Sequence, residues 1–184
     1  HIRLEKDDGL FSFIETGLEA DEGSNFSNYY KVAFGYWHSS AHFEDFSGKE
    51  RNHNAGFYFI GEKSVFAEAD PAQGLGLFMQ SGFTEEDRNQ VNQYYGLGLA
   101  YTGLLPRRDS DTLYFGINLA RNGDDYVDAA AGRLRAESAL ELSYQAEILP
   151  YLRVQPDIQF VINPGMDTQV DNALVLGVRL EIDL

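Results

Sequence analysis

LRVQPDIQFVINPG, residues 152–165, alternates between apolar and polar side chains. The apolar parity holds Leu152, Val154, Ile158, Phe160 and Ile162, and the polar parity holds Arg153, Gln155, Asp157, Gln159 and Asn163. A period of two is typical of a β-strand with one apolar face and one polar face. Pro156 falls on the apolar parity and lacks the backbone N–H that a sheet needs. We therefore expect a local bend or bulge at Pro156.

The same alternation recurs along the rest of the chain. It is found in residues 9–18, 30–38, 55–69, 74–83, 94–102, 112–120, 139–148 and 174–184. In residues 55–69 the parity breaks, so we expect a bulge within residues 57–63. The sequence predicts about nine strands of about ten residues each, the length that a tilted strand needs to cross a bilayer. It predicts no amphipathic helix.

The connections between these strands form two classes. Short turns are expected at 70–73, 106–111 and 149–152, and long loops are expected at 39–54, 84–93, 121–137 and 163–172. With the C-terminus placed inside, the short turns lie on the periplasmic side and the long loops outside, as in outer-membrane barrels. The long connection at 19–28 is the exception, because it falls on the inner side.

Composition narrows the function classes. The net charge is -15, from 29 acidic and 14 basic residues, which argues against a nucleic-acid partner. The absence of cysteine excludes disulfides and thiolate metal sites. No apolar run is long enough for a membrane-spanning helix. The mean hydropathy of -0.34 still fits a transmembrane barrel, because only alternate residues face lipid.

Two other all-β folds remain open at this point. A soluble β-sandwich also alternates, but the strand length and the unequal connections favour a membrane barrel. The other alternative is a small closed barrel with eight strands. Its interior is filled by side chains and leaves no pore, so its role would be adhesion, binding or hydrolysis and not transport.

Three segments resemble the carbohydrate-selective porins, the OprB-type family. They are residues 74–117, residues 137–165, which contain VQPDIQFVINPG, and residues 172–184; the strand with Trp37 and His38 resembles the family as well. The resemblance covers about residues 9–184. It implies an all-β fold, an antiparallel transmembrane barrel of about sixteen strands when complete. Residues 1–184 are then expected to be the C-terminal half of one barrel domain.

The resemblance also implies a function. The protein is expected to be a channel in the outer membrane of a Gram-negative bacterium, used for passive, weakly selective diffusion of small carbohydrates, and not an enzyme. A selective sugar pore needs donors, acceptors and an aromatic plate along its wall, each binding weakly. The candidate pore-lining residues are Trp37, Glu141, Gln145, Arg153, Gln155, Asp157, Gln159, Arg179 and Glu181. The alternative is that they only hydrate the interior wall.

No cofactor or metal is expected. His38 and His42 lack a third ligand, and residues 122–128 lack the order of an EF-hand loop. The expected partners are small sugars and outer-membrane lipid, with no nucleic acid, and a homo-oligomer is left open.

Overall fold

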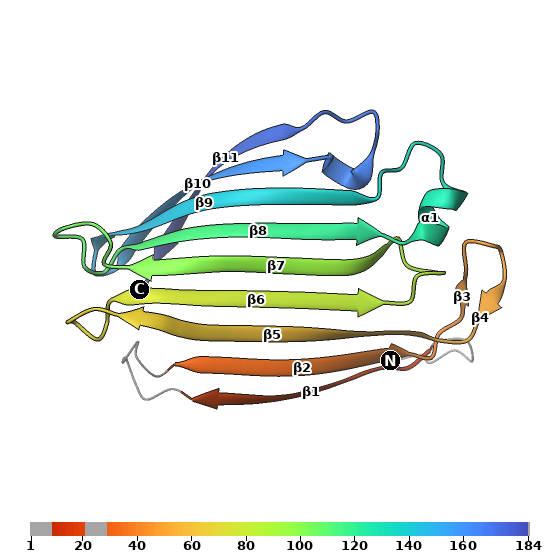
Figure 1. Ribbon diagram of the computed structural model, residues 1–184, viewed down its shortest axis with the longest axis horizontal. Coiled ribbons are helices and arrows are strands. Elements are labelled where there is room, and N and C mark those ends of the chain that lie inside the picture. Colours follow the sequence, from red (N-terminus) through yellow and green to blue (C-terminus); the bar gives the residue numbers. More distant parts are fainter. Residues whose placement is uncertain (1–8, 21–28, 184) are drawn as a thin grey trace, which may run out of the picture.

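A computed structural model describes residues 9–20 and 29–183 and shows one long antiparallel sheet (Figure 1). The sheet has nine strands, which confirms the number and type predicted from the alternation. The strands are β1 (Phe11–Ala20), β2 (Tyr30–Ser39), β5 (Asn54–Ala67), β6 (Gly74–Thr84), β7 (Val91–Thr102), β8 (Thr112–Asn122), β9 (Ala136–Leu149), β10 (Leu152–Ile162) and β11 (Ala173–Ile182).

Each strand of the sheet pairs with the strands before and after it in the chain, giving the order β1-β2-β5-β6-β7-β8-β9-β10-β11. The sheet coils, and its C-terminal strands turn behind the plane of the central strands (Figure 1). Within the described residues, β1 and β11 are the two edges and do not pair with each other. The chain therefore forms a curved open sheet and does not close into a small barrel by itself.

Most apolar residues of the nine strands lie on one face, which we call the apolar face, although a few, such as Phe13, Ile60 and Phe78, are on the opposite face. The pairs Phe115–Leu99 and Ile117–Leu97 show how the register aligns them across β7 and β8. The only buried apolar side chains in the described part are Ala33 and Met166, and most large apolar side chains of the strands are exposed. No second sheet covers this face, so the β-sandwich is excluded and hydrocarbon is the cover that this face fits.

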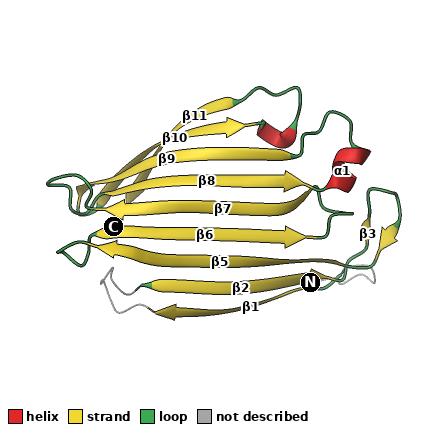
Figure 2. Cartoon of the chain, viewed as in Figure 1, coloured by secondary structure: helices red, strands yellow, loops and turns green. Residues whose placement is uncertain are grey.

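The connections at the two ends of the sheet differ as the sequence predicted. At one end the strands are joined by short turns. The other end carries the hairpin of β3 (Phe43–Glu44) and β4 (Glu50–Arg51), the helix α1 (Asp124–Ala129) and the 3-10 turn η1 (Pro164–Met166) (Figure 2). The helix α1 is a six-residue turn of the loop 121–137 without a buried residue, so it is not the amphipathic helix whose absence was expected. No described helix is long and apolar enough to cross a membrane. The connection expected at 19–28 lies mostly outside the described residues.

Two local expectations are corrected by the register. The irregularity in β5 falls between Ser64 and Phe66, just beyond the expected range 57–63, so Val65 is the extra residue. Pro156 causes no bulge. The pairing of β10 with β9 keeps one register on both sides of Pro156, from the Val154–Ala146 pair to the Asp157–Ser143 pair. The pairing with β9 is interrupted only at Gln155 and Pro156.

The short turn between β7 and β8 is tied to β9 by Asp111, whose side chain is buried. Its carboxylate accepts hydrogen bonds from Arg108 Nε at 2.5 Å, from the Glu147 backbone N–H at 2.9 Å and from the Tyr144 hydroxyl. Burial alone would raise the pKa of Asp111, but these bonds outweigh burial and hold the pKa below its usual value. The turn is thereby fixed against the neighbouring strand.

The assignment of the apolar face can be tested on β8, which is paired on both sides. Ile117→Arg in the full-length protein should destabilise the inserted state by about 2–4 kcal/mol, because the charge would face hydrocarbon near the middle of the strand. Asn118→Arg, on the opposite face, is the matched control and should have little effect. Unfolding by urea from bilayers measures both. Equal effects would contradict the assignment.

Candidate functional site: the polar face of the sheet

The face opposite the apolar face carries the polar residues, and we call it the polar face. The register places all nine candidate residues on it. Eight of them are on three adjacent strands: Glu141 and Gln145 on β9, Arg153, Gln155, Asp157 and Gln159 on β10, and Arg179 and Glu181 on β11. Trp37 is on β2, separated from this group by β5, β6, β7 and β8. The sheet therefore brings together eight candidates and leaves Trp37 apart.

An ion pair lies on the polar face at the short-turn end. Arg153 and Glu181 are direct register partners, and Arg153 Nη1 lies 2.7 Å from Glu181 Oε1 and 3.3 Å from Asp183 Oδ2. The side chains of Arg153 and Glu181 are 36% and 35% exposed. Water therefore screens the pair, and we expect it to shape the wall more than to stabilise the fold.

The middle of this group contains side-chain hydrogen bonds. Gln155 Nε2 donates to Ser143 Oγ at 2.6 Å, and Gln159 Nε2 donates to Asp157 Oδ1 at 3.2 Å. Gln145 accepts a long bond of 3.4 Å from the Tyr114 hydroxyl. These residues hold one another in place along the wall.

Glu141 and Arg179 differ from the rest of the group. Within the described part of the chain neither makes an ion pair or a side-chain hydrogen bond, although both are on the polar face. Their charged ends are free to bind a solute, whereas Arg153 and Glu181 are already bound to each other.

A second group on the polar face consists of aromatic rings that lie against buried glycines of neighbouring strands. Trp37 lies against Gly56, Tyr58 against Gly35 and Phe78 against Gly98, and in each case a Cβ on the glycine would meet the ring. The rings are thereby laid flat on the wall.

Sequence reasoning selected Trp37 and missed Tyr58 and Phe78. Glycines on the polar parity of β2 and β7 were the available signal, because a strand position without a side chain leaves room for a ring from the next strand.

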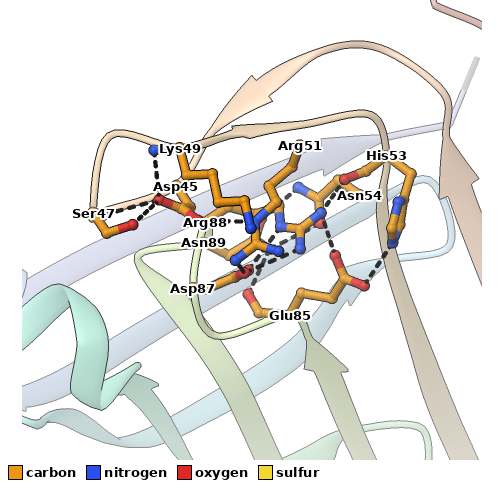
Figure 3. Close-up of polar contacts among 10 residues, drawn as sticks. All are labelled: Asp45, Ser47, Lys49, Arg51, His53, Asn54, Glu85, Asp87, Arg88 and Asn89. Carbon is orange, nitrogen blue, oxygen red and sulfur yellow. Dashed lines mark hydrogen bonds and ion pairs between the residues drawn. The ribbon is translucent and has the colours of Figure 1, made fainter.

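The long-loop end is held by a cluster of polar contacts between the β3–β4 hairpin and the loop after β6 (Figure 3). At its centre is the Asp45 carboxylate, whose side chain is 2% exposed. It accepts hydrogen bonds from the Ser47 hydroxyl at 2.6 Å, the Lys49 N–H at 2.9 Å and Arg51 Nε at 2.8 Å. Arg51 also reaches Asp87 at 3.0 Å. Asp45 therefore holds the residues of the hairpin together, and Arg51 connects the hairpin to the loop after β6.

Arg88 connects the second loop to the same cluster. Its side chain is 5% exposed and contacts Glu85 at 2.8 Å and Asp87 at 2.7 Å, and it donates to the His53 carbonyl. Asn54 and Asn89 exchange two side-chain hydrogen bonds, of 2.8 and 2.9 Å. A charge buried without these partners would be unfavourable, so the two loops are fixed together.

The hydrogen bonds around Asp45 determine its ionisation. The Ser47 hydroxyl contributes most, followed by the Lys49 N–H and, against the effect of burial, Arg51, and together they hold the pKa of Asp45 far below its usual range. Beside it, the Arg88 guanidinium lowers the pKa of Asp87. Both carboxylates therefore stay charged under all physiological conditions, and the cluster is present at neutral pH.

The helix α1 packs onto this cluster. The rings of Phe46 and Tyr126 have centroids 5.1 Å apart, and the Gly123 N–H donates to the Gln90 carbonyl at 3.0 Å. Among the described residues there is no group of three or more His, Cys, Asp or Glu side chains that could hold a metal ion. The long loops form an ordered rim at one end of the polar face.

The rim can be tested by proteolysis of the full-length protein. Asp45→Asn removes the charge that the hairpin is built around, so trypsin should cleave after Lys49 or Arg51 about tenfold faster, as local opening becomes easier. The neighbouring Glu44 is exposed, so Glu44→Gln is the control, and trypsin should cleave this variant at the wild-type rate. If both variants are cleaved like the wild type, Asp45 does not hold the hairpin.

Comparison with known proteins confirms the resemblance. A family profile described as carbohydrate-selective porin, OprB family, matches residues 14–184. Porin B of Pseudomonas aeruginosa is 28% identical over 151 residues, which cover 72% of this chain and 33% of that protein. The chain thus spans a minor part of this relative's length.

Two solved structures of Pseudomonas putida OprB show the same fold. The high-pH structure has a TM-score of 0.85 and 23% identity, over 95% of this chain and 49% of that chain. The low-pH structure has a TM-score of 0.66 and 20% identity, over 97% and 48%. The chain belongs to the carbohydrate-selective porin, OprB family.

Proposed function

We propose that this chain forms part of the wall of an outer-membrane channel through which small sugars diffuse passively and with weak selectivity. The observation that supports this most directly is the division of the sheet into two faces. One face is apolar and uncovered, and the other carries donors, acceptors and flat aromatic rings. A wall one residue thick with these two faces fits a boundary between lipid and water.

The proposal extends to the whole protein, in which residues 1–184 form the C-terminal half of a barrel of about sixteen strands. The unpaired edges of β1 and β11 support it, because unpaired backbone groups in hydrocarbon are costly. Further strands paired with both edges would supply hydrogen-bond partners for these backbone groups. The solved relatives, about twice as long as this chain, are consistent with that arrangement. A closed eight-stranded barrel for adhesion or hydrolysis fits less well.

Sugar recognition on this wall would use two kinds of contact. The faces of Trp37, Tyr58 and Phe78 suit the weakly apolar faces of a sugar ring. Glu141 and Arg179, which lack partners within the described residues, suit its hydroxyl groups. The paired residues Gln145, Arg153, Gln155, Asp157, Gln159 and Glu181 would keep the wall hydrated and hold its shape. Each contact is weak, which permits release as well as entry.

The charge of the polar face favours neutral solutes over anions. Its basic strand residues are Lys31, Arg153 and Arg179, and its acidic ones are Glu15, Glu19, Glu62, Glu137, Glu141, Glu147, Asp157 and Glu181. A wall with an excess of carboxylates repels an anion along its length, whereas an uncharged sugar is unaffected.

A comparison of two solutes of equal size tests this directly. In liposomes that contain the full-length protein, a neutral hexose should enter faster than the sugar acid made by oxidising one end of it. The difference should shrink as salt rises, because salt screens the wall. Faster entry of the acid, or equal rates at low salt, would contradict the proposal.

The aromatic part of the proposal is tested by Trp37→Ala. Loss of the ring should weaken sugar-dependent block of the ion current by about two- to tenfold, as expected for one aromatic contact. Tyr36→Ala is the matched control, since Tyr36 is the adjacent aromatic residue on the apolar face. Single-channel conductance in planar bilayers gives the measurement. An unchanged block in Trp37→Ala would remove this residue from the binding surface.

A further inference from the structure

The apolar face carries a charged side chain, Lys63, that no described residue neutralises. Among the described strand residues on this face, only Lys63 and Arg121 are charged. Arg121 is near the long-loop end and lies 3.6 Å from Asp124. Lys63 is exposed and makes no ion pair with any described residue. An ammonium group facing lipid needs an anion or water within reach of its long side chain.

The position of Lys63 along the membrane normal follows from the register. Its direct partner is Tyr30, the first residue of β2, so Lys63 is level with the short-turn end of that strand. This is the level where tyrosines and lysines meet the polar headgroups. Tyr30 is 42% exposed on the same face, and its hydroxyl makes no hydrogen bond to a described residue. Two donors are therefore presented side by side at the inner boundary of the bilayer.

A hollow adjoins this pair of donors on the apolar face. Gly61, two residues before Lys63, offers no side chain, and the neighbouring Val32, Leu77, Met79 and Leu97 surround a cavity of about 510 Å³. A Cβ on Gly61 would come within 3.2 Å of Met79. The hollow is apolar and begins directly at Lys63, so it continues from the headgroup level toward the hydrocarbon.

We propose that Lys63, Tyr30 and the hollow at Gly61 form a binding site for one phospholipid of the inner leaflet. The lipid phosphate accepts hydrogen bonds from the Lys63 ammonium and the Tyr30 hydroxyl, and an acyl chain lies in the hollow. The site requires only that the sheet faces lipid. It does not depend on which solute the channel carries.

Charge complementarity selects the phospholipid over a second copy of the protein. The described strands present no acidic residue on the apolar face, so a second copy packed there by the same face would bury Lys63 without an anion. A phosphate supplies that charge, and only a lipid supplies an acyl chain for the hollow as well.

Native mass spectrometry of the full-length protein with added phosphatidylglycerol tests the proposal. The wild type should retain one lipid, and Lys63→Met should weaken retention by about tenfold, as expected for the loss of one charge-assisted hydrogen bond. Lys49→Met is the matched control, because Lys49 is an exposed lysine in the β3–β4 hairpin at the opposite, long-loop end of the sheet. Diacylglycerol, which has the same chains without a phosphate, should not be retained by the wild type.

A second variant tests the hollow. Gly61→Leu keeps Lys63 and fills the space for the acyl chain, so it should also reduce retention of phosphatidylglycerol. Sugar flux through both variants should equal that of the wild type, which shows that the barrel is folded and separates this site from transport. Equal retention by Lys63→Met and the wild type would overturn the proposal. So would a wild-type oligomer that is lost in Gly61→Leu while lipid retention is unchanged, because the hollow would then hold a second copy.

Discussion

The whole structure depends on backbone hydrogen bonding in a medium that cannot supply any. In hydrocarbon each peptide N–H and C=O has to be satisfied by the protein itself. Here the antiparallel ladder continues from β1 to β11 through strands that are neighbours in the chain. Pro156 shows how little interruption this permits, since its register with β11 is kept at the Pro156–Val178 pair. On the β9 side the pairing is interrupted at Gln155 and Pro156 and resumes at Asp157.

The pleat of the same ladder separates two solvents. Successive side chains point to opposite faces, so lipid and water are one residue apart along every strand. The wall has almost no apolar interior, since only Ala33 and Met166 are buried apolar residues in the described part. The residue type at each strand position is therefore determined by the solvent that its own face contacts. Glycine is the exception, because at Gly56 it is the neighbouring Trp37 that requires it.

The sequence predicted what depends on period and missed what depends on register. Strands, faces and the location of all nine candidates follow from alternation, which is local. The ring of Tyr58 over Gly35 depends on two positions that are far apart in the chain and become partners only when β2 and β5 pair. The bulge in β5 was predicted, but its position at Val65 was not, and the short helix α1 was not predicted. Contacts such as Phe46 with Tyr126 join different loops, and no periodic signal reports them.

The charged residues divide into two groups by what they contact. At the long-loop end Asp45 and Arg88 are almost fully covered and each is bound to several partners. Such charges maintain a shape, because removing one leaves others buried without compensation. On the polar face Glu141 is partly exposed, Arg179 is exposed, and neither has an ion-pair or hydrogen-bond partner among the described residues. The buried charges at the long-loop end are thus fixed by their contacts, whereas the charges of Glu141 and Arg179 are not fixed by any described residue.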